Sequence, residues 1–330
     1  MGEKPKIAIC WLGACGGCDE AIVDLNEGLL DVAEAVSIEL WPVAMDFKYD
    51  HLTAFGQGEI AVGLVSGHVR NSEHAEVARL LRDRCRLIIA LGACACFGGT
   101  PGLANLVPRE EILDTVYRTA PSVVNPDGTI PEVETPWEGE ALRLPAFLDH
   151  VYTLNQVIDV DYYIPGCPPP PELIRNGVWA VLTDDLPPKG STLAPRKALC
   201  ETCPRNKTKP MRFEIHGPIR RIHEVEADPE MCFLADGILC MGPGTRAGCG
   251  ETCIRANTPC RGCFGPVPGV SDPGSRFISS LAALLKVGTT GDPRAVMASI
   301  GDPVGYLYRF THPISTLGAR RLSEEAEETP

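Results

Sequence analysis

Residues 6–25, KIAICWLGACGGCDEAIVDL, set the fold of the first half of the chain. They begin with an apolar run typical of a buried strand, pass through a loop rich in glycine and cysteine, and continue with apolar residues at helical spacing. The same order of apolar run and amphipathic segment recurs up to residue 185. Such alternation predicts a parallel sheet with helices on both faces.

The expected elements follow from these runs. Strands are predicted at 6–12, 36–43, 59–67, 86–94 and 162–167, and helices at 18–33, 72–84 and 171–184. Ser72 is the expected N-cap of the second helix. The predicted class is α/β, with a flavodoxin-like doubly wound parallel sheet of strand order 2-1-3-4-5, followed by a smaller, irregular cysteine-rich domain. Residues 121–140 are Pro-rich and acidic, which predicts a long surface loop.

Length and charge limit the function. The 330 residues suffice for one large and one smaller domain, and 44% hydrophobic with 22% charged residues is ordinary for a soluble protein. A net charge of −13 disfavours a nucleic-acid partner. Apolar runs stay below the roughly 18 residues of a membrane span, and MGEKPKIAICWLG shows no signal peptide. We expect a cytoplasmic protein with free thiols.

Three cysteine motifs follow predicted strands: CGGC at 15–18, GACAC at 92–96 and PGC at 165–167. Ligands of open α/β sheets bind at the carboxyl ends of the strands. We therefore expect Cys15, Cys18, Cys94 and Cys167 to converge on one metal cluster, with Cys96 either replacing Cys94 or lying just outside the site. The first loop could instead cradle a phosphate, although cradles favour Ser, Thr and Gly over paired thiols.

The other residues near these motifs have simpler interpretations. Cys10 and Cys85 lie in or beside apolar strands and are expected to be small buried hydrophobic residues. Histidines show no paired ligand spacing, and His68, after the third strand, is the best candidate to contact the site from outside. Glu20 fits an acidic residue in the first turn of a helix.

Residues 200–263 hold eight of the fifteen cysteines: Cys200, Cys203, Cys232, Cys240, Cys249, Cys253, Cys260 and Cys263. Little apolar core is expected between them, so bound metal would order the segment. A zinc ribbon uses two CxxC pairs, but four more cysteines lie between these pairs, which favours iron–sulfur clusters. The odd total of cysteines also disfavours a disulfide framework.

Taken together, CGGC at 15–18, GACACFGG at 92–99 and PGCPPPPE at 165–172 resemble the small subunit of NiFe hydrogenases. The run from CETCPR to CRGCFGP resembles more closely the small subunits of cytoplasmic methanogen-type enzymes. These are the viologen-reducing, heterodisulfide-reductase-linked hydrogenase and its deazaflavin-reducing relative. The resemblance covers residues 5–270. Residues 1–185 alone also resemble a cluster-bearing subunit of respiratory complex I, which usually has adjacent cysteines in place of CGGC.

The resemblance implies three 4Fe-4S clusters in a row, each held by four cysteines. The proximal group, next to the NiFe centre of a partner large subunit, is Cys15, Cys18, Cys94 and Cys167. Pairing by order along the chain gives a distal group of Cys200, Cys203, Cys232 and Cys240. The medial group is then Cys249, Cys253, Cys260 and Cys263, although the eight could interleave. Periplasmic relatives carry histidine at the position of Cys200 and can hold a three-iron medial cluster.

The implied function is electron transfer in a cytoplasmic hydrogenase of methanogenesis, with no catalytic residue in this chain. Electrons from H2 would pass from the large subunit to an iron–sulfur or flavin acceptor such as heterodisulfide reductase. The alternatives are the gamma subunit of a deazaflavin-reducing hydrogenase, a zinc-stabilised binding module, and a complex I-like cluster subunit. The expected domains are 1–186 and 187–330, the latter with one or two helices in 275–300 and an acidic tail.

Overall fold

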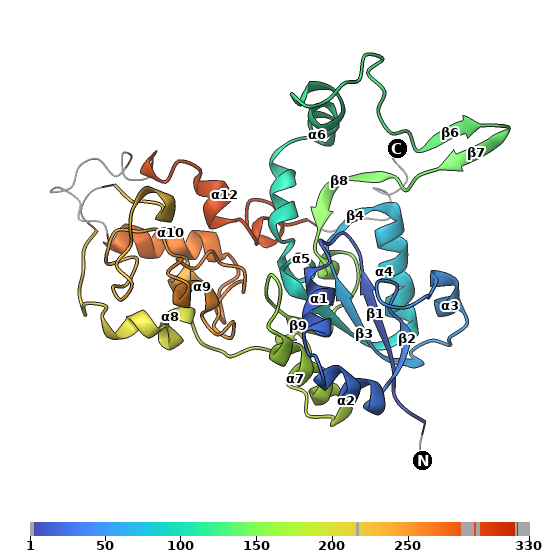
Figure 1. Ribbon diagram of the computed structural model, residues 1–330, viewed down its shortest axis with the longest axis horizontal. Helices are drawn as coiled ribbons and strands as arrows, with labels where there is room; N and C mark the ends of the chain where they lie inside the picture. Colours follow the sequence, from blue (N-terminus) through green and yellow to red (C-terminus); the bar gives the residue numbers. More distant parts are fainter. Residues whose placement is uncertain (1–2, 216–217, 285–293, 295–297, 321, 323–330) are drawn as a thin grey trace.

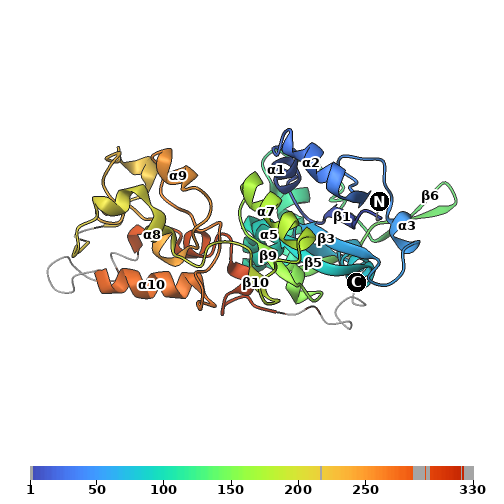
Figure 2. The same cartoon turned by 90° about the horizontal axis from the view of Figure 1, so that it is seen from below.

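The computed structural model describes residues 3–215, 218–284, 294, 298–320 and 322. The chain forms two bodies that lie side by side (Figure 1). The first is built on a sheet with helices on both faces, and the second consists of short helices joined by irregular loops (Figure 2). In the described part of the chain, no helix combines the length and the apolar character that crossing a bilayer requires.

The sheet has six parallel strands in the order β10-β9-β5-β3-β1-β2. Their bounds are β1 (Lys6–Trp11), β2 (Ser37–Leu40), β3 (Ile60–Ser66), β5 (Cys85–Leu91), β9 (Tyr162–Ile164) and β10 (Ser191–Thr192). The predicted α/β class and the order 2-1-3-4-5 are therefore confirmed. Of the six strands of this sheet, the prediction missed only β10, which lies at the edge.

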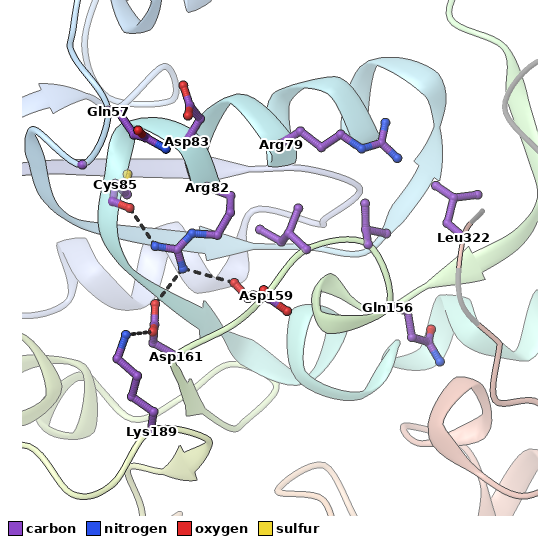
Figure 3. A pocket seen from close by; sticks show the side chains of 13 residues that line it. Gln57, Arg79, Arg82, Asp83, Cys85, Gln156, Asp159, Asp161, Lys189 and Leu322 are labelled. Atoms are coloured by element: carbon purple, nitrogen blue, oxygen red, sulfur yellow. Dashed lines mark hydrogen bonds and ion pairs between the residues drawn. The ribbon is translucent and has the colours of Figure 1, made fainter. Parts of the chain in front are cut away.

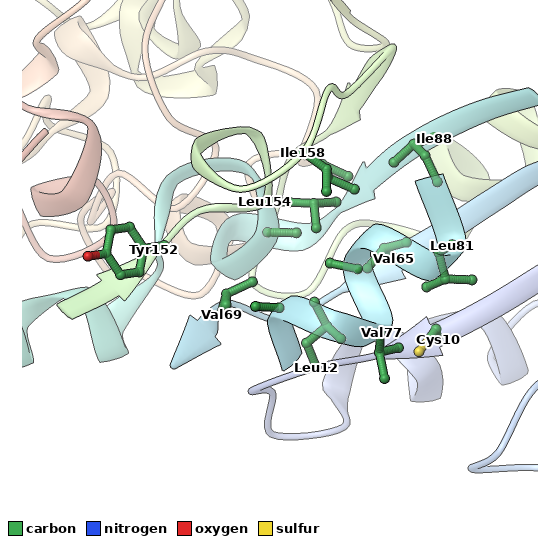
Figure 4. Packing of buried hydrophobic residues seen from close by; sticks show 14 of the residues in the cluster. Cys10, Leu12, Val65, Val69, Val77, Leu81, Ile88, Tyr152, Leu154 and Ile158 are labelled. Atoms are coloured by element: carbon green, nitrogen blue, oxygen red, sulfur yellow. The ribbon is translucent and has the colours of Figure 1, made fainter. Parts of the chain in front are cut away.

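Two apolar clusters cover the two faces of the sheet. Ala8 and Cys10 of β1 belong to one cluster, together with Leu81 of α4 (Ser72–Arg84). Figure 4 shows residues of this cluster. Ile7 and Ile9 point the other way, because successive side chains of a strand alternate between faces. On that second face lie α1 (Gly17–Val23), α2 (Gly28–Ala35) and α7 (Pro171–Leu182).

Two details of the helices differ from the prediction. The helix expected at 18–33 is two helices, α1 and α2, because Asn26 between them has a left-handed φ of +53° that a helix cannot continue through. The N-cap of α4 is Asn71 and not Ser72, since Asn71 Oδ1 accepts a hydrogen bond from the His74 amide at 2.8 Å. A run of polar residues before a helix does not reveal which of them caps it.

The predicted surface loop belongs to a longer arm that projects from the first body (Figure 1). It leaves the 3-10 turn Thr100–Leu106, passes through α6 (Arg109–Asp114) and a π turn (Thr115–Thr119), and returns in β8 (Phe147–Tyr152), which pairs with β4 (Val69–Asn71). Residues 121–140 are largely exposed, as expected. Their end forms part of an unpredicted hairpin of β6 (Glu134–Trp137) and β7 (Glu140–Arg143).

The second body has its own apolar core, contrary to the prediction. Phe233 and Leu239 are buried there against Phe277 of α10 (Pro273–Leu284) and Tyr306 of α12 (Pro303–Leu307). Helices that follow the cysteine-rich stretch in sequence thus supply the apolar surface that the stretch itself lacks. The other elements are α8 (Leu199–Thr202), α9 (Thr252–Arg255) and 3-10 turns at Pro204–Lys207, Ile222–Glu224, Gly242–Gly244 and His312–Ile314.

Of the helices expected within 275–300, α10 is confirmed, while 285–293 and 295–297 lie outside the described residues. Most of the predicted acidic tail, 323–330, also lies outside them. In the first body the remaining helices are α3 (Tyr49–Thr53), α5 (Gly92–Phe97) and the short turn Leu154–Gln156.

A cavity of about 750 Å³ opens at the edge opposite the carboxyl ends of the strands (Figure 3). The buried carboxylate of Asp161 accepts hydrogen bonds from Arg82 at 2.7 Å, the Ile88 amide at 2.8 Å and Lys189 at 2.5 Å. Burial alone would raise the pKa of Asp161, but the hydrogen bonds from Lys189, Arg82 and Ile88 outweigh it and lower the pKa below its ordinary value. Asp161 therefore ties three segments of this edge together.

Asp161→Asn should lower the free energy of unfolding by about 2 kcal/mol at neutral pH, because Arg82 and Lys189 lose a buried counter-charge. The lowered folded pKa means that this stabilisation is present above the unfolded pKa of about 3.9 and is lost as pH falls through the folded value. Urea midpoints measured as a function of pH should therefore converge in acid.

Asp83→Asn is the matched control, since Asp83 lines the same cavity with a side chain that is 46% exposed. It should change the midpoint little at any pH. Equal losses in both variants, or a difference that persists in acid, would contradict the role given to Asp161.

Candidate metal centres

The structure brings the proximal group together at the carboxyl edge of the sheet. Cys15 and Cys18 lie where β1 leads into α1, Cys94 lies in α5 directly after β5, and Cys167 follows β9. Burial raises the pKa of the Cys18 thiol, and the nearby thiols of Cys94, Cys167 and Cys15 raise it further. Burial raises the pKa of Cys94 to about 12, with contributions from Cys167 and Cys15. Four thiols from three strand ends therefore face one another.

Glycines let the backbone approach these sulfurs closely. A Cβ at Gly92, where φ is +83°, would lie 2.3 Å from Cys18 Sγ, and one at Gly99 would lie 2.5 Å from Cys94 Sγ. Gly13 pairs with His68 through both backbone hydrogen bonds, and its own Cβ would lie 2.6 Å from the imidazole. Burial lowers the pKa of His68 to about 4, so a neutral imidazole supports the CGGC loop.

The remaining cysteines of the first body point elsewhere. The Cys96 thiol is buried and directed at the carbonyl oxygens of Ala90 (3.3 Å) and Ile164 (3.5 Å), whereas Cys94 faces the other three thiols. This geometry favours Cys94 over Cys96 as the fourth ligand. Cys10 and Cys85 are buried in the apolar core, as expected. Glu20 is an exposed residue in the first turn of α1, which also fits its simpler interpretation.

The distal group surrounds one small cavity of the second body. Its lining includes all four expected thiols and the apolar side chains of Leu199, Phe233 and Ile254. Burial raises the pKa of Cys200 to about 12, with further contributions from Cys240, Cys232 and Cys203. Pairing these four by order along the chain therefore agrees with their positions in space.

The medial group lines a larger cavity, of about 460 Å³. All four expected thiols face it, together with Cys167 of the proximal group and the prolines that follow Cys167. Burial raises the pKa of Cys263 to about 12, and Cys249, Cys167 and Cys253 add to this shift. The medial group therefore lies against the proximal one.

Two contacts connect the three groups. Cys167 of the proximal group lines the medial cavity, and its backbone acts to lower the pKa of the Cys263 thiol. The amide of Met241, next to the distal Cys240, donates to the carbonyl of the medial Cys260 at 2.9 Å. The three groups therefore lie in the order proximal, medial, distal.

The four thiols of each group do not converge on a single point. Among the described residues, no three His, Cys, Asp or Glu side chains are gathered tightly enough to hold a single metal ion. A 4Fe-4S cluster needs a wider arrangement, because each thiolate binds a different iron at a corner of the cube. Backbone amides directed at the sulfurs, such as those of Gly242 and Cys260 at Cys240, are the donors that tune such clusters.

The sequence interpretation missed buried charged residues beside these groups, among them Asp19, Arg205 and Glu251. Asp19 accepts hydrogen bonds from Trp41 Nε1 at 3.0 Å and Ser66 Oγ at 3.2 Å, and burial raises its pKa. Arg205 lines the distal cavity. Asp19 follows Cys18 and Arg205 lies two residues after Cys203, and this proximity to expected ligands could have indicated both. An acidic residue at the start of a helix and a basic residue in a loop usually face solvent, however.

Residues 15–181 match the family described as "NADH ubiquinone oxidoreductase, 20 Kd subunit", which defines the class of oxidoreductase subunit to which the first body belongs. The iron–sulfur subunit of the F420-non-reducing hydrogenase of Archaeoglobus profundus is 44% identical over 85% of this chain and 88% of its own length. A subunit of the F420-non-reducing hydrogenase of Methanothermobacter thermautotrophicus is 37% identical over 96% of this chain and 97% of its own length.

The chain therefore belongs to the family of these F420-non-reducing hydrogenase subunits, which confirms the family expected from the cysteine motifs. It is an electron-transfer subunit of a hydrogenase and thus a component of an oxidoreductase. A chain of the solved NAD+-reducing NiFe-hydrogenase in its H2-reduced state is 33% identical over 55% of this chain and 93% of its own length, with a TM-score of 0.48.

Gly92→Ala should remove iron from the proximal group, because the added methyl would occupy the space of Cys18 Sγ. We expect a loss of about four of about twelve irons per chain, measured as iron and acid-labile sulfide, with unchanged circular dichroism.

Gly58→Ala is the control, since it places the same methyl at a φ of +65° with no atom within 4 Å. It shares the backbone strain and lacks the steric clash, so it should retain full iron. Full iron in Gly92→Ala would show that the proximal thiols are not held as described.

Proposed function

We propose that this subunit relays electrons from a hydrogenase large subunit through three 4Fe-4S clusters to a second redox protein. The ligands would be the proximal, medial and distal groups as defined by their twelve cysteines. One observation carries the proposal: three groups of four thiols lie in a row, with the proximal Cys167 lining the medial cavity and the Met241 amide, beside the distal Cys240, hydrogen-bonded to the medial Cys260. When bound, each cluster would accept and donate one electron at a time.

The arrangement favours iron–sulfur clusters over a zinc-stabilised binding module. A Cys₄ zinc ion holds its thiolates about 3.8 Å apart, given Zn–S bonds of about 2.3 Å in a tetrahedron. Among the described residues no set of thiols that close is found, and backbone donors at sulfur suit a cubane instead. The chain's own part is to hold the sulfurs, exclude water from them and direct amides at them.

The proximal group supports a large-subunit partner that carries the NiFe centre. Cys15 and Cys167 are exposed at the carboxyl edge, as is the medial Cys253, whereas every distal thiol is buried or half-buried. A partner covering this edge would reach the proximal group directly. The names of the relatives, all hydrogenase subunits, agree with such a partner.

For the acceptor, we propose an iron–sulfur or flavin protein of the heterodisulfide reductase type. The two relatives described above are named F420-non-reducing, which favours this assignment over the gamma subunit of a deazaflavin-reducing enzyme. The identity of the chains that co-purify with the complex distinguishes the two.

We further propose a cytoplasmic location and a division of the chain into 1–186, which carries the proximal group, and 187–330, which carries the other two. The change from sheet to irregular structure comes after β10 (Ser191–Thr192), so the sheet extends a few residues beyond this boundary. Free thiols throughout the described cysteines suit a reducing compartment.

Anaerobically purified protein should be brown and contain about twelve irons and as many sulfides per chain, as three Cys₄ cubanes require. Reduction with dithionite should produce paramagnetic signals from all three clusters. A colourless protein containing zinc, or fully loaded protein without such signals, would refute the proposal.

Cys260→Ser should lower the iron content and block electron transfer to the acceptor, because Cys260 is a proposed medial ligand and its backbone joins the distal group. Cys85→Ala is the control, since Cys85 is equally buried but lies in the apolar core of the first body. Normal reduction of the acceptor by Cys260→Ser would show that the medial assignment is wrong.

A further inference from the structure

A buried cation lies beside the distal group. Arg205 follows Cys203 by two residues and is only 5% exposed. It lines the same cavity as the four distal thiols. Burial raises the pKa of Cys203, the backbone amide and the charge of Arg205 act to lower it, and the charges of Cys232 and Glu251 act to raise it. The guanidinium is therefore within electrostatic reach of the distal sulfurs.

Neutral groups hold this guanidinium in place. Its Nη1 donates to the carbonyl oxygens of Asp228 at 2.8 Å and Met231 at 2.7 Å, and its Nη2 donates to Asn257 Oδ1 at 2.5 Å. Its centre lies 3.8 Å from the centroid of the Phe233 ring. These contacts fix the position of the charge without neutralising it.

The two carboxylates that act on this site, those of Asp228 and Glu251, do not hydrogen-bond the guanidinium. Asp228 offers its backbone oxygen to Arg205, while its Oδ1 accepts from the amides of Glu230 and Met231 at 2.8 and 3.0 Å. In the described part of the chain, Arg205 thus forms no ion pair with an acidic side chain. A buried charge is costly unless an opposite charge compensates it.

Four thiolates around iron provide that opposite charge. A 4Fe-4S cluster with four thiolate ligands is anionic, and one-electron reduction adds a further negative charge. A fixed cation nearby stabilises the reduced form more than the oxidised form, because the attraction grows with the charge. Net local charge and hydrogen bonds to sulfur are known determinants of the potentials of such clusters.

We propose that Arg205 is a positioning charge that raises the reduction potential of the distal cluster and so favours arrival of the electron at the end of the relay. The proposal rests on the function proposed above. In the step concerned, the medial cluster is oxidised by one electron and the distal cluster is reduced by the same electron, with no bond broken and no proton required.

The test is a potentiometric titration of the anaerobically purified holo complex, followed by electron paramagnetic resonance. The distal component is assigned as the signal lost or altered in Cys232→Ala. For Arg205→Gln, the reduced-to-oxidised ratio of this component at the wild-type midpoint should fall at least about tenfold, which equals about 59 mV for one electron. Iron content should remain at the wild-type value.

Three further variants separate charge from structure. Arg205→Lys keeps the cation and should change the ratio less than about threefold. Asn257→Asp removes no donor from Arg205 but places a carboxylate on Nη2, and should lower the ratio as Arg205→Gln does. Arg276→Gln removes an exposed arginine of α10 and should change nothing.

If Arg205→Gln loses the distal cluster, Asn257→Asp decides the outcome, because Arg205 keeps its own hydrogen-bond acceptors in that variant. An unchanged distal potential in Asn257→Asp, or an equal shift in Arg205→Lys and Arg205→Gln, would overturn the role of the charge. A wild-type complex without a distal cluster would overturn the proposed function and this inference together. A loaded wild type with unshifted variants would overturn only the inference.

Discussion

The close approach of the two bodies is the constraint on which the arrangement of the three cysteine groups depends. Cys167 of the first body lines the medial cavity of the second, together with Cys263. This contact requires the two bodies to dock without intervening side chains. Gly265 meets this need, because a Cβ there would lie 2.3 Å from the Phe97 ring of α5. The glycine is required where the irregular body meets the helix that carries Cys94.

The C-terminal segment holds the same junction from the other side. Cβ atoms at Gly98 and Gly102 would lie 2.2 and 2.5 Å from Pro313, and Phe310 joins the apolar core of the first body. Gln156 donates to the Pro313 carbonyl at 2.7 Å. The chain therefore passes from the sheet to the cysteine-rich body and back again. This double crossing lets loops with little regular structure hold their sulfurs at fixed positions.

The sheet could be predicted from sequence because buried parallel strands read as continuous apolar runs followed by helical periodicity. The proximal group followed, since the carboxyl ends of those strands lie at one edge. The core of the second body could not be predicted, because Phe277 and Tyr306 come from far along the chain. The break at Asn26, the short strand β10 and the burial of Arg205 likewise depend on tertiary contacts that no local pattern records.

The fixed charges along the row differ from one end to the other. Beside the proximal Cys18 lies Asp19, whose side chain is hydrogen-bonded by Trp41 and Ser66. The medial cavity is lined by one acid, Glu251, and one base, Arg261. At the distal cavity lies Arg205, and Glu251 also acts on the distal Cys203. A negative charge disfavours an added electron and a positive charge favours it. In the proposed relay, Asp19 would thus disfavour an electron at the proximal end, and Arg205 would favour one at the distal end against the opposing charge of Glu251.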